Sequence, residues 1–320
     1  MSAAMTAGGR VDVVIPAYNA SRFIVAALRS VVAQAPHVAS VIVVDDGSTD
    51  DTALLVKAFA ADCPEGLIRC ITQPNAGTAA ARNTGLGLAQ AEFVALLDAD
   101  DIWKPGKLTA QLERFDHPAF PNLGVVYCDY DLMTEDGQPL PNCGFRLNRR
   151  IRGNVERRLL RANLIAGSAS AVLIRRSCLD QVGLFDPSLI CAEDWDLWLR
   201  LAGTYAYDYA AEEMVTLRRH SSSWQNNRRQ MVSSEMLFVN KLHKLGKARW
   251  FHYVRLERQL VCEGIDAASL RGFADCDPAF RRIFYGWAMR ACAAAFRVGY
   301  RLRDLARWVG RSIRTRRSQK

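Results

Sequence analysis

The chain has 320 residues, is 50% hydrophobic and carries a formal charge of +9, so it can bury a large core and is not an intrinsically disordered protein. Its nine cysteines are scattered and never form a Cys-x-x-Cys pair, so neither a zinc site nor a disulfide framework is indicated. The first ten residues lack the apolar centre of a signal peptide, and no run reaches the roughly 18 apolar residues of a membrane-spanning helix.

The positive charge is concentrated at the C-terminal end. Residues 281–320 contain twelve basic residues and one acid, Asp304, which leaves residues 1–280 near −2. A nucleic-acid-binding domain is typically basic over its main body, and no known nucleic-acid-reading motif is present. We therefore expect no nucleic-acid partner.

The N-terminal part of the chain alternates between predicted strands and predicted helices. An apolar run at residues 11–15 predicts a strand that ends at Pro16, because proline cannot donate a hydrogen bond to a central sheet. Apolar side chains at helical spacing predict a helix at residues 21–34 with Ser21 as its cap. The β-branched run at residues 40–44 is typical of a strand buried on both faces of a parallel sheet.

The alternation continues with strands predicted at residues 67–72 and 93–97 and a helix at residues 78–90 between them. This pattern predicts a doubly wound α/β sheet, in which ligand groups lie at the carboxyl ends of the strands. Beyond Trp103 the alternation is weaker, and after about residue 230 the pattern is helical and increasingly basic. The remaining predicted elements are strands at residues 124–133 and 168–174, a loop at 134–156 and a helix at 192–202.

Three acids, Asp98, Asp100 and Asp101, directly follow the predicted strand at residues 93–97. Positions two apart in a strand project to the same side, so Asp98 and Asp100 can aim two carboxylates at one point. Mg²⁺ and Mn²⁺ prefer oxygen ligands and bind through one or two carboxylates together with substrate phosphates. A solvated turn with helix-capping acids has the same pattern, so the motif alone leaves both interpretations open.

Asp45 and Asp46 follow the predicted strand at residues 40–44 in the same way. A carboxylate at this edge can accept the imide proton of uracil or a ribose hydroxyl proton, although a plain Asx turn is the alternative. Because helical crossovers join the two acid-tipped strands, we expect these strands to lie side by side.

Five motifs occur in a characteristic order. They are Pro16-Ala17-Tyr18-Asn19, Val44 to Asp50, Asn75-Ala76-Gly77 with Ala81 to Gly85, Leu97 to Asp101, and Glu193-Asp194-Trp195-Asp196-Leu197. In this order the sequence strongly resembles the family 2 glycosyltransferases, which are inverting enzymes of the GT-A fold. The resemblance covers roughly residues 10–222 and implies a doubly wound mixed α/β sheet flanked by helices.

The resemblance also implies a site for a nucleoside-diphosphate sugar. The residues implied to lie around its base and ribose are Pro16, Tyr18 and Asp46, with Asp45 alongside, and those implied to line the nucleotide and diphosphate pocket are Asn75, Gly77, Arg82 and Asn83. Arg82 would bind phosphate or hold the acidic loop, and a structural ion pair with an aspartate is the alternative. Asp98 and Asp100 match the family's Asp-x-Asp motif, and Asp100 would bind Mn²⁺ or Mg²⁺ directly.

The catalytic half of the site is implied by Glu193 and Asp194, of which Asp194 matches the family's general base. In an inverting transfer the base accepts the proton of the acceptor hydroxyl as it attacks the anomeric carbon. Acids that favour the first turn of a helix are the alternative for this pair. Trp195 and Trp198 have the helical spacing of core residues, which we favour over sugar stacking.

Leu217-Arg218-Arg219-His220 resembles the segment that follows the base helix, where an arginine and a histidine approach the diphosphate. The aromatic residue often found before the arginine is absent. We predict that Arg219 binds the nucleotide sugar and that His220 binds metal or phosphate, and the alternative for His220 is a surface loop. The Gln-x-x-Arg-Trp motif of processive synthases is also absent, which favours addition of a single sugar.

We divide the chain into a disordered N-terminus at residues 1–10, a GT-A domain at 11–225 and a helical, basic C-terminal region at 226–320. The tail has apolar residues at helical spacing and arginines on its other sides, which predicts a helix lying on an anionic membrane. A helix packed on the catalytic domain is the alternative. The apolar stripe is Phe284, Trp287, Ala291, Ala295, Val298, Leu302, Leu305 and Val309.

Together these features predict an inverting, metal-dependent glycosyltransferase that uses a UDP-sugar and adds its sugar to a glycan or lipid-linked acceptor in surface polysaccharide synthesis. We expect it to be cytoplasmic and peripheral at the inner face of the cell membrane. A catalytically silent nucleotide-sugar binding module is the rival interpretation. A nicotinamide dehydrogenase is disfavoured because no Gly-x-Gly-x-x-Gly follows the first strand.

Overall fold

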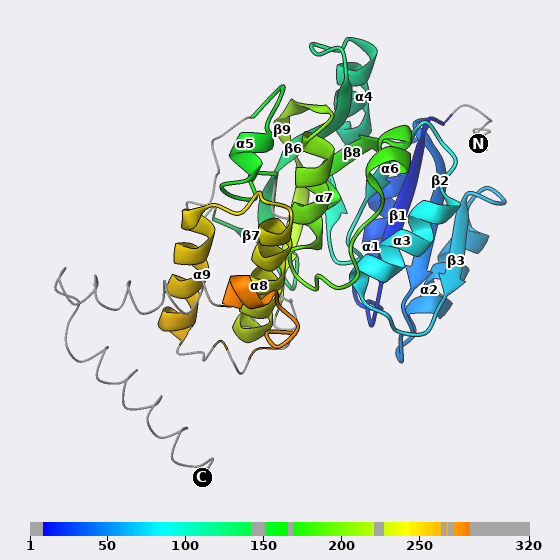
Figure 1. Ribbon diagram of the computed structural model, residues 1–320. Coiled ribbons are helices and arrows are strands. Elements are labelled where there is room, and N and C mark those ends of the chain that lie inside the picture. The colour runs from blue at the N-terminus through cyan, green and yellow to red at the C-terminus, as the bar shows by residue number, and fades with distance from the viewer. Residues whose placement is uncertain are drawn as a thin grey trace. The chain divides into compact units, whose positions relative to one another are not determined.

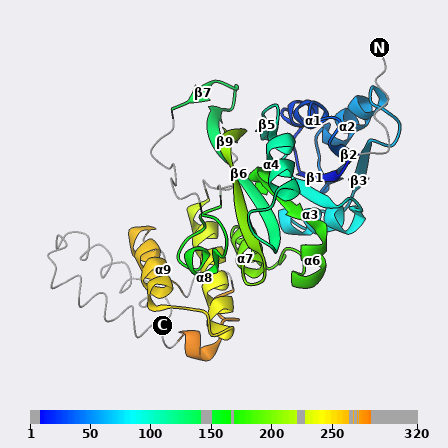
Figure 2. The same ribbon diagram turned by 90° about the horizontal axis from the view of Figure 1, so that it is seen from above.

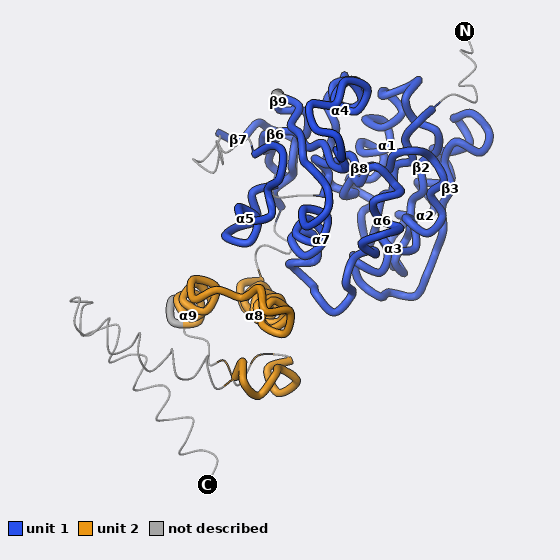
Figure 3. The backbone as a smooth tube through the Cα atoms, turned by 45° about the horizontal axis from the view of Figure 1, so that its top comes forward, with its two compact units in different colours: residues 1–222 blue, residues 223–320 orange. Residues whose placement is uncertain are grey.

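The structure is a computed structural model that describes residues 9–141, 151–165, 169–220, 227–263, 267, 270 and 272–281 (Figure 1). The chain divides into two compact units, residues 1–222 and residues 223–320, which are described separately (Figure 3). The predicted disordered N-terminus at residues 1–10 lies mostly outside the described residues. The predicted membrane helix from Phe284 to Val309 lies wholly outside them.

The first half of unit 1 is a parallel sheet of buried strands, and it confirms the four strands predicted there. Their order is β3-β2-β1-β4, with β1 at Val11–Ala17, β2 at Val38–Asp45, β3 at Ile68–Thr72 and β4 at Phe93–Leu96. The predicted adjacency of the two acid-tipped strands is wrong, because β1 lies between β2 and β4. The acids after β2 and β4 still share one edge of the sheet, since all four strands run in the same direction.

Strand β1 continues through Pro16, where the sequence predicted its end. The Val14 carbonyl accepts the Leu97 N–H on the β4 side, and the Ala17 carbonyl accepts the Asp46 N–H on the β2 side. This alternation turns the nitrogen of Pro16 toward β4, but β4 pairs with β1 only as far as Val14. Pro16, which has no N–H to donate, therefore lies just where the pairing with β4 ends.

The second half of the sheet is mixed. Strand β8 (Val172–Arg175) is antiparallel to β4 and to β6 (Leu123–Thr134), and β9 (Ala206–Arg219) is parallel to β6. Two short strands complete it, β5 (Ile102–Trp103) against β9 and β7 (Pro139–Leu140) against β6. Sequence analysis found β6 and β8 but missed β5, β9 and β7, the last of which lies in the predicted loop.

Helices cover both faces of the sheet, and Figure 2 shows α1 and α2 on one face and α3 and α6 on the other. The helices of unit 1 are α1 (Ile24–Val32), α2 (Thr52–Ala61), α3 (Thr78–Leu88), α4 (Lys107–Asp116), α5 (Glu156–Leu159), α6 (Arg176–Val182) and α7 (Glu193–Ala202). Val13 of β1 belongs to a core that includes Leu28 of α1 and Leu112 of α4. On the other face Val14 packs so closely on α3 that a Cβ at Gly85 would lie 2.3 Å from it, so only glycine fits there.

Helix α1 begins later than predicted. It starts at Ile24 rather than Ser21, and Ser21 does not cap it. The Ser21 N–H donates to the Asp50 carboxylate at 3.1 Å, which holds residues before α1 in a turn against the loop that follows β2.

Unit 2 is helical in its described part. Helix α8 (Arg228–Lys244) and helix α9 (Trp250–Glu263) share a core that includes Met236 and Val239 of α8 and Leu256 and Leu260 of α9. Among the described helices of the protein, none combines the length and the apolar character that spanning a bilayer requires.

Candidate active site

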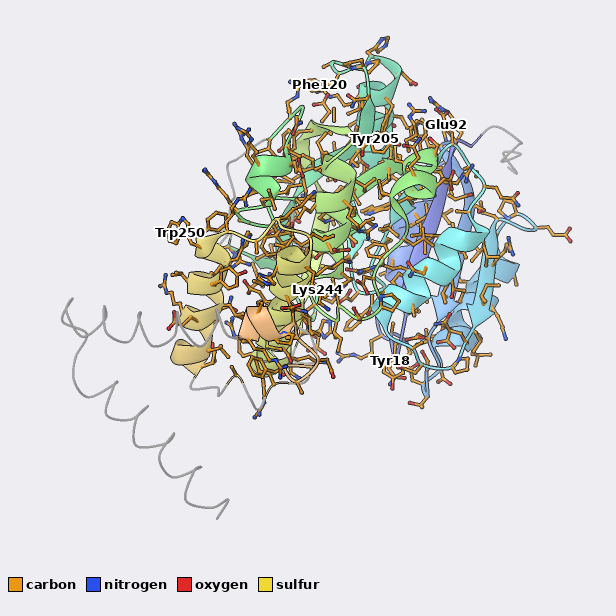
Figure 4. The ribbon with its side chains drawn as sticks, in the orientation of Figure 1. Tyr18, Glu92, Phe120, Tyr205, Lys244 and Trp250 are labelled. Carbon is orange, nitrogen blue, oxygen red and sulfur yellow. The ribbon has the colours of Figure 1, made fainter. Side chains whose placement is uncertain are left out.

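The candidate site lies at the carboxyl edge of the parallel strands. Figure 4 shows Tyr18, which follows β1, at the opposite end of the sheet from Glu92, which precedes β4. Asp98 and Asp100 follow β4 at the same edge as Tyr18, and both are half-buried. The predicted site residues of the first four motifs are therefore brought to one edge of the sheet.

Arg82 of α3 joins the two acidic motifs. Its Nη2 donates to Asp98 Oδ1 at 2.7 Å and its Nη1 donates to Glu193 Oε1 at 2.8 Å, while the residue is only 4% exposed. Burial alone would lower the pKa of Arg82, but the Asp98 and Glu193 carboxylates outweigh it and raise that pKa. The structure thus shows Arg82 in the ion-paired role that sequence analysis left as one alternative, with its terminal nitrogens committed to carboxylates.

Asn83, the next residue of α3, contacts the backbone of a neighbouring loop. Its amide nitrogen donates to the Phe185 carbonyl and its amide oxygen accepts the Phe185 N–H, both at 2.9 Å. The Phe185 ring lies 5.2 Å from the Arg82 guanidinium, so Asn83 holds the ring against that cation.

Asp194 lies in the first turn of α7. Its Oδ1 accepts the Trp195 N–H at 2.6 Å and its Oδ2 accepts a hydrogen bond from the Asn163 amide at 3.2 Å. Burial raises the pKa of Asp194 above that of an ordinary aspartate, against the opposing charge of Arg82. Burial likewise raises the pKa of Glu193. The site therefore holds a carboxylate with increased affinity for a proton, as a general base requires.

The tryptophans of α7 are core residues, as predicted. Trp198 is fully buried, and Trp195 is buried with its indole N–H donating to the Leu159 carbonyl at 2.7 Å.

Asp100 and His220 meet across the sheet edge. Asp100 Oδ2 and His220 Nε2 are 2.8 Å apart, although the two residues are 120 positions apart in the chain. The His220 ring lies 5.3 Å from the Phe23 ring. Arg219, the last residue of β9, is half-buried.

A metal at this point would need ligands from the substrate. Among the described residues no group of three or more His, Cys, Asp or Glu side chains is arranged to hold a metal ion. Asp100 and His220 offer one oxygen and one nitrogen, which suit Mn²⁺ and leave coordination positions for phosphate oxygens. The residues present therefore fit an ion that is bound together with a diphosphate.

The loop after β2 forms the other half of the edge. Asp46 Oδ1 accepts hydrogen bonds from Gln73 and from the Ala76 N–H, and its Oδ2 accepts the Gly77 N–H at 2.8 Å. Asp45 is buried beside it, with Oδ1 accepting the Ser48 N–H. Asp46 thus anchors the segment of Asn75 and Gly77, while Tyr18 is 52% exposed at the same edge.

Pro16 is buried, and Asn19 links the loop after β1 to the loop after β2. The Asn19 N–H donates to the Ser48 hydroxyl at 2.9 Å, and the Asn19 side-chain oxygen accepts the Thr49 N–H at 2.8 Å. Asn75 is exposed beyond these loops. This half of the candidate site therefore combines loops that are hydrogen-bonded to one another with an exposed aromatic side chain, Tyr18.

The family model for glycosyl transferase family 2 matches residues 12–183. The chain belongs to this family. It is therefore a glycosyltransferase, as the order of the five motifs predicted.

Two curated relatives illustrate the family's range. The succinoglycan biosynthesis protein ExoU of Rhizobium meliloti is 36% identical over 210 residues, which are 61% of this chain and 58% of ExoU. The putative teichuronic acid biosynthesis glycosyltransferase TuaG of Bacillus subtilis is 37% identical over 130 residues, which are 41% of this chain and 50% of TuaG. The match spans less than two thirds of either relative's length.

Solved glycosyltransferase structures share the fold. The mannosyltransferase PcManGT from Pyrobaculum calidifontis, in complex with GDP-Man and Mn²⁺, has a TM-score of 0.59 at 20% identity and covers 92% of this chain and 84% of its own. S. aureus TarS 1–349 in complex with UDP-GlcNAc has a TM-score of 0.56 at 18% identity, covering 94% and 79%. The predicted GT-A fold is confirmed.

Four residues to which sequence analysis assigned no role contact the candidate site residues. Asn163 holds the candidate base, and Asp101, Ser170 and Arg218 contact the Asp-x-Asp loop. Asp101 and Arg218 adjoin predicted site residues, so their position in the chain was a usable signal. Asn163 and Ser170 lie in segments without a motif, and no local pattern could have found them.

Proposed function

We propose that this glycosyltransferase moves a sugar, with inversion, from a UDP-sugar to a hydroxyl of a glycan or lipid-linked acceptor in surface polysaccharide synthesis. The main support for this proposal is that Arg82 contacts both Asp98 of the Asp-x-Asp motif and Glu193, the neighbour of Asp194. One buried cation thereby ties the diphosphate side of the site to the side of the general base.

Asp194 accepts the acceptor hydroxyl proton while the new bond to the anomeric carbon forms and the bond to the diphosphate breaks. Asn163 and the Trp195 N–H fix the orientation of its carboxylate, since each occupies one of its oxygens. The raised pKa of Asp194 makes it a better proton acceptor than an ordinary aspartate. The positive charge of Arg82 opposes this effect of burial and favours the ionised carboxylate that a base needs.

Asp100, Asp98 and His220 would hold Mn²⁺ or Mg²⁺, and the bound ion would neutralise charge on the departing diphosphate. Asp45, Asp46, Asn75, Gly77, Tyr18 and Pro16 would receive the nucleoside, and Arg219 would face its phosphates. That Mn²⁺ and GDP-Man accompany PcManGT and that UDP-GlcNAc accompanies TarS supports a nucleotide sugar and a divalent ion here.

The acceptor and the location are proposed from relatives and charge. ExoU and TuaG are named for biosynthesis of polysaccharides, which supports a surface glycan acceptor. Twelve basic residues at 281–320 support association with the anionic inner face of the cell membrane, where a lipid-linked acceptor would lie.

The test is donor turnover by the full chain with UDP-, GDP- and dTDP-sugars, with Mn²⁺ and with excess EDTA. We expect turnover of a UDP-sugar that EDTA abolishes and that Asp100→Ala abolishes. Asp62→Ala, which changes an exposed aspartate just after α2, is the matched control and should retain turnover. Binding without turnover of any donor would instead support the silent binding module, and full activity of Asp100→Ala would contradict the metal role.

A further inference from the structure

Asp101 is buried at the centre of a hydrogen-bonded cluster beside the Asp-x-Asp motif. It is 4% exposed, its Oδ2 accepts the Ser170 hydroxyl proton at 2.7 Å, and its Oδ1 accepts the Arg218 N–H at 3.2 Å. Ser170 and Arg218 lie 69 and 117 positions away in the chain. A single carboxylate therefore connects three segments of unit 1 at the end of β4.

Ser170 fastens the Asp-x-Asp loop from both sides. Its hydroxyl oxygen accepts the Asp98 N–H at 2.9 Å while its proton goes to Asp101, and its carbonyl accepts the Trp103 indole N–H at 2.9 Å. A hydroxyl has one proton to donate and lone pairs to accept with, so both hydrogen bonds are satisfied at once. Ser170 thereby sets the position of the chain from Asp98 to Trp103.

Arg218 fastens the end of β9 to the same loop. Its Nε donates to the Asp100 carbonyl at 3.0 Å and its Nη1 donates to the Glu135 carbonyl at 2.7 Å. Its guanidinium also lies 4.8 Å from the Phe23 ring, which is the ring next to His220. Arg218 is thus committed to backbone carbonyls and to an aromatic face, two positions before His220.

We propose that Asp101, Ser170 and Arg218 form a positioning clamp that holds the end of β9 against the Asp-x-Asp loop and so keeps His220 beside Asp100. In this role the clamp residues act through the backbone of their neighbours and not on the substrate or the metal directly. This inference rests on the proposed function in so far as Asp100 and His220 bind the metal and the diphosphate.

The chemistry of the clamp has a specific consequence. The Ser170 hydroxyl and the Arg218 backbone N–H are both neutral donors, so an asparagine can keep these two contacts in place of the carboxylate. In Asp101→Asn the amide oxygen can still accept the Arg218 N–H, and the amide nitrogen can donate to the Ser170 oxygen. Asp101→Ala loses both contacts, and Ser170→Ala leaves the Asp98 N–H and Asp101 Oδ2 without their shared partner.

The experiment compares Asp101→Asn, Asp101→Ala and Ser170→Ala in the full chain. Mn²⁺ binding in the presence of UDP is followed by the electron paramagnetic resonance signal of free Mn²⁺. We expect Asp101→Ala and Ser170→Ala to weaken that binding by about 10-fold or more, as loss of groups that orient metal ligands does, while Asp101→Asn stays close to the wild type. Ser30→Ala is the matched control, because Ser30 is also buried and accepts the Trp103 N–H of the same loop without touching Asp101.

A second readout does not depend on the metal. Amide hydrogen exchange of the segments at residues 94–101 and 214–220, which exclude the Trp103 N–H that Ser30 itself accepts, should speed up in Asp101→Ala and Ser170→Ala and remain unchanged in Asp101→Asn and Ser30→Ala. If Asp101→Asn weakens Mn²⁺ binding as much as Asp101→Ala, the charge of Asp101 acts directly and the clamp is wrong. Unchanged exchange in all variants would also overturn it. Failure of the wild type to bind Mn²⁺ with UDP would contradict the proposed function, and the exchange experiment would still decide the clamp.

Discussion

Two buried cations of unit 1 lie in contrasting surroundings. Arg82, at the active-site edge, ion-pairs with Asp98 and Glu193. Lys107 of α4 is fully buried, and its contacts are the Gln111 side-chain oxygen at 2.8 Å and the Trp103 ring at 4.0 Å. The pKa of Arg82 is raised, whereas burial lowers the pKa of Lys107 to about 8.

The difference shows what a carboxylate partner does for a buried charge. Taking a cation out of water costs several kcal/mol, and nearby carboxylates recover that cost while neutral oxygens and rings recover only part of it. Arg82 is a stable charge that organises the acids around it. Burial disfavours the charged form of Lys107, which packs against the Trp103 ring and is not one of the candidate active-site residues.

The largest expected effect concerns the carboxylate next to the Arg82 ion pair. Asp194→Asn keeps the size of the side chain but cannot accept a proton, so we expect sugar transfer to fall by about 10² to 10⁴ while UDP-sugar affinity changes little. Because burial raises the pKa of Asp194, the acid limb of the wild-type rate profile should lie above the pH expected of an ordinary aspartate.

The measurement is the initial rate of transfer and the UDP-sugar dissociation constant of the same preparations. Asp180→Asn, on the exposed side of α6, is the control and should match the wild type. If UDP-sugar binding in Asp194→Asn falls as much as the transfer rate, Asp194 has a structural role and is not the general base.

The parallel part of the fold could be predicted because its signals are local. The strands at 40–44 and 93–97 are buried on both faces and read as continuous apolar runs, and the acids that follow mark the ligand edge. The contact between Arg82 and Glu193 spans 111 positions, so spacing could not show it. Resemblance brought these residues to one site, but it did not decide which groups Arg82 contacts.

Strand β9 illustrates why the mixed second half of the sheet was harder to predict from the sequence. It carries Asp208 in its interior, fully buried and paired with Arg152 of a distant segment. A charged residue inside a strand breaks the apolar pattern, and the partner that neutralises it is visible only in the fold. Helix α4 was missed for a related reason, since it buries the polar side chains of Lys107 and Gln111.

The second prediction removes the cation of the site. Arg82→Met leaves Glu193 buried without its partner, so we expect a loss of about 3–5 kcal/mol in the free energy of unfolding, as measured when one member of a buried ion pair is removed. Lys107→Met is the matched control and should be close to neutral, because removing the unfavourable charge offsets the lost hydrogen bond to Gln111. Chemical denaturation of both variants at pH 7 measures the difference.

A double variant separates charge from packing. Arg82→Met combined with Glu193→Gln removes both charges of the pair and should recover part of the lost stability. No recovery would assign the loss to the packing of Arg82 on Phe185 instead. Equal losses for Arg82→Met and Lys107→Met would show that the carboxylates do not distinguish the two sites.

The smallest effect expected is the pH dependence that Lys107 adds to stability. Its pKa is about 8 in the folded protein and near the ordinary 10.5 when unfolded. Below pH 8 lysine is protonated in both states and the folded protein bears the full cost of the buried charge. Between pH 8 and 10.5 the folded state releases its proton first, so the unfolded state binds more protons and stability rises with pH, by about 3 kcal/mol in total.

Lys107→Met should lack this rise. Subtracting its unfolding free energies from those of the wild type between pH 7 and 10.5 cancels the titrating groups that do not interact with Lys107. Cys128 does interact with Lys107, but burial raises the pKa of the Cys128 thiol to about 11, above this pH range. A flat difference would mean that Lys107 keeps its proton as Arg82 does, and that Gln111 and the Trp103 ring stabilise a buried cation as well as carboxylates do.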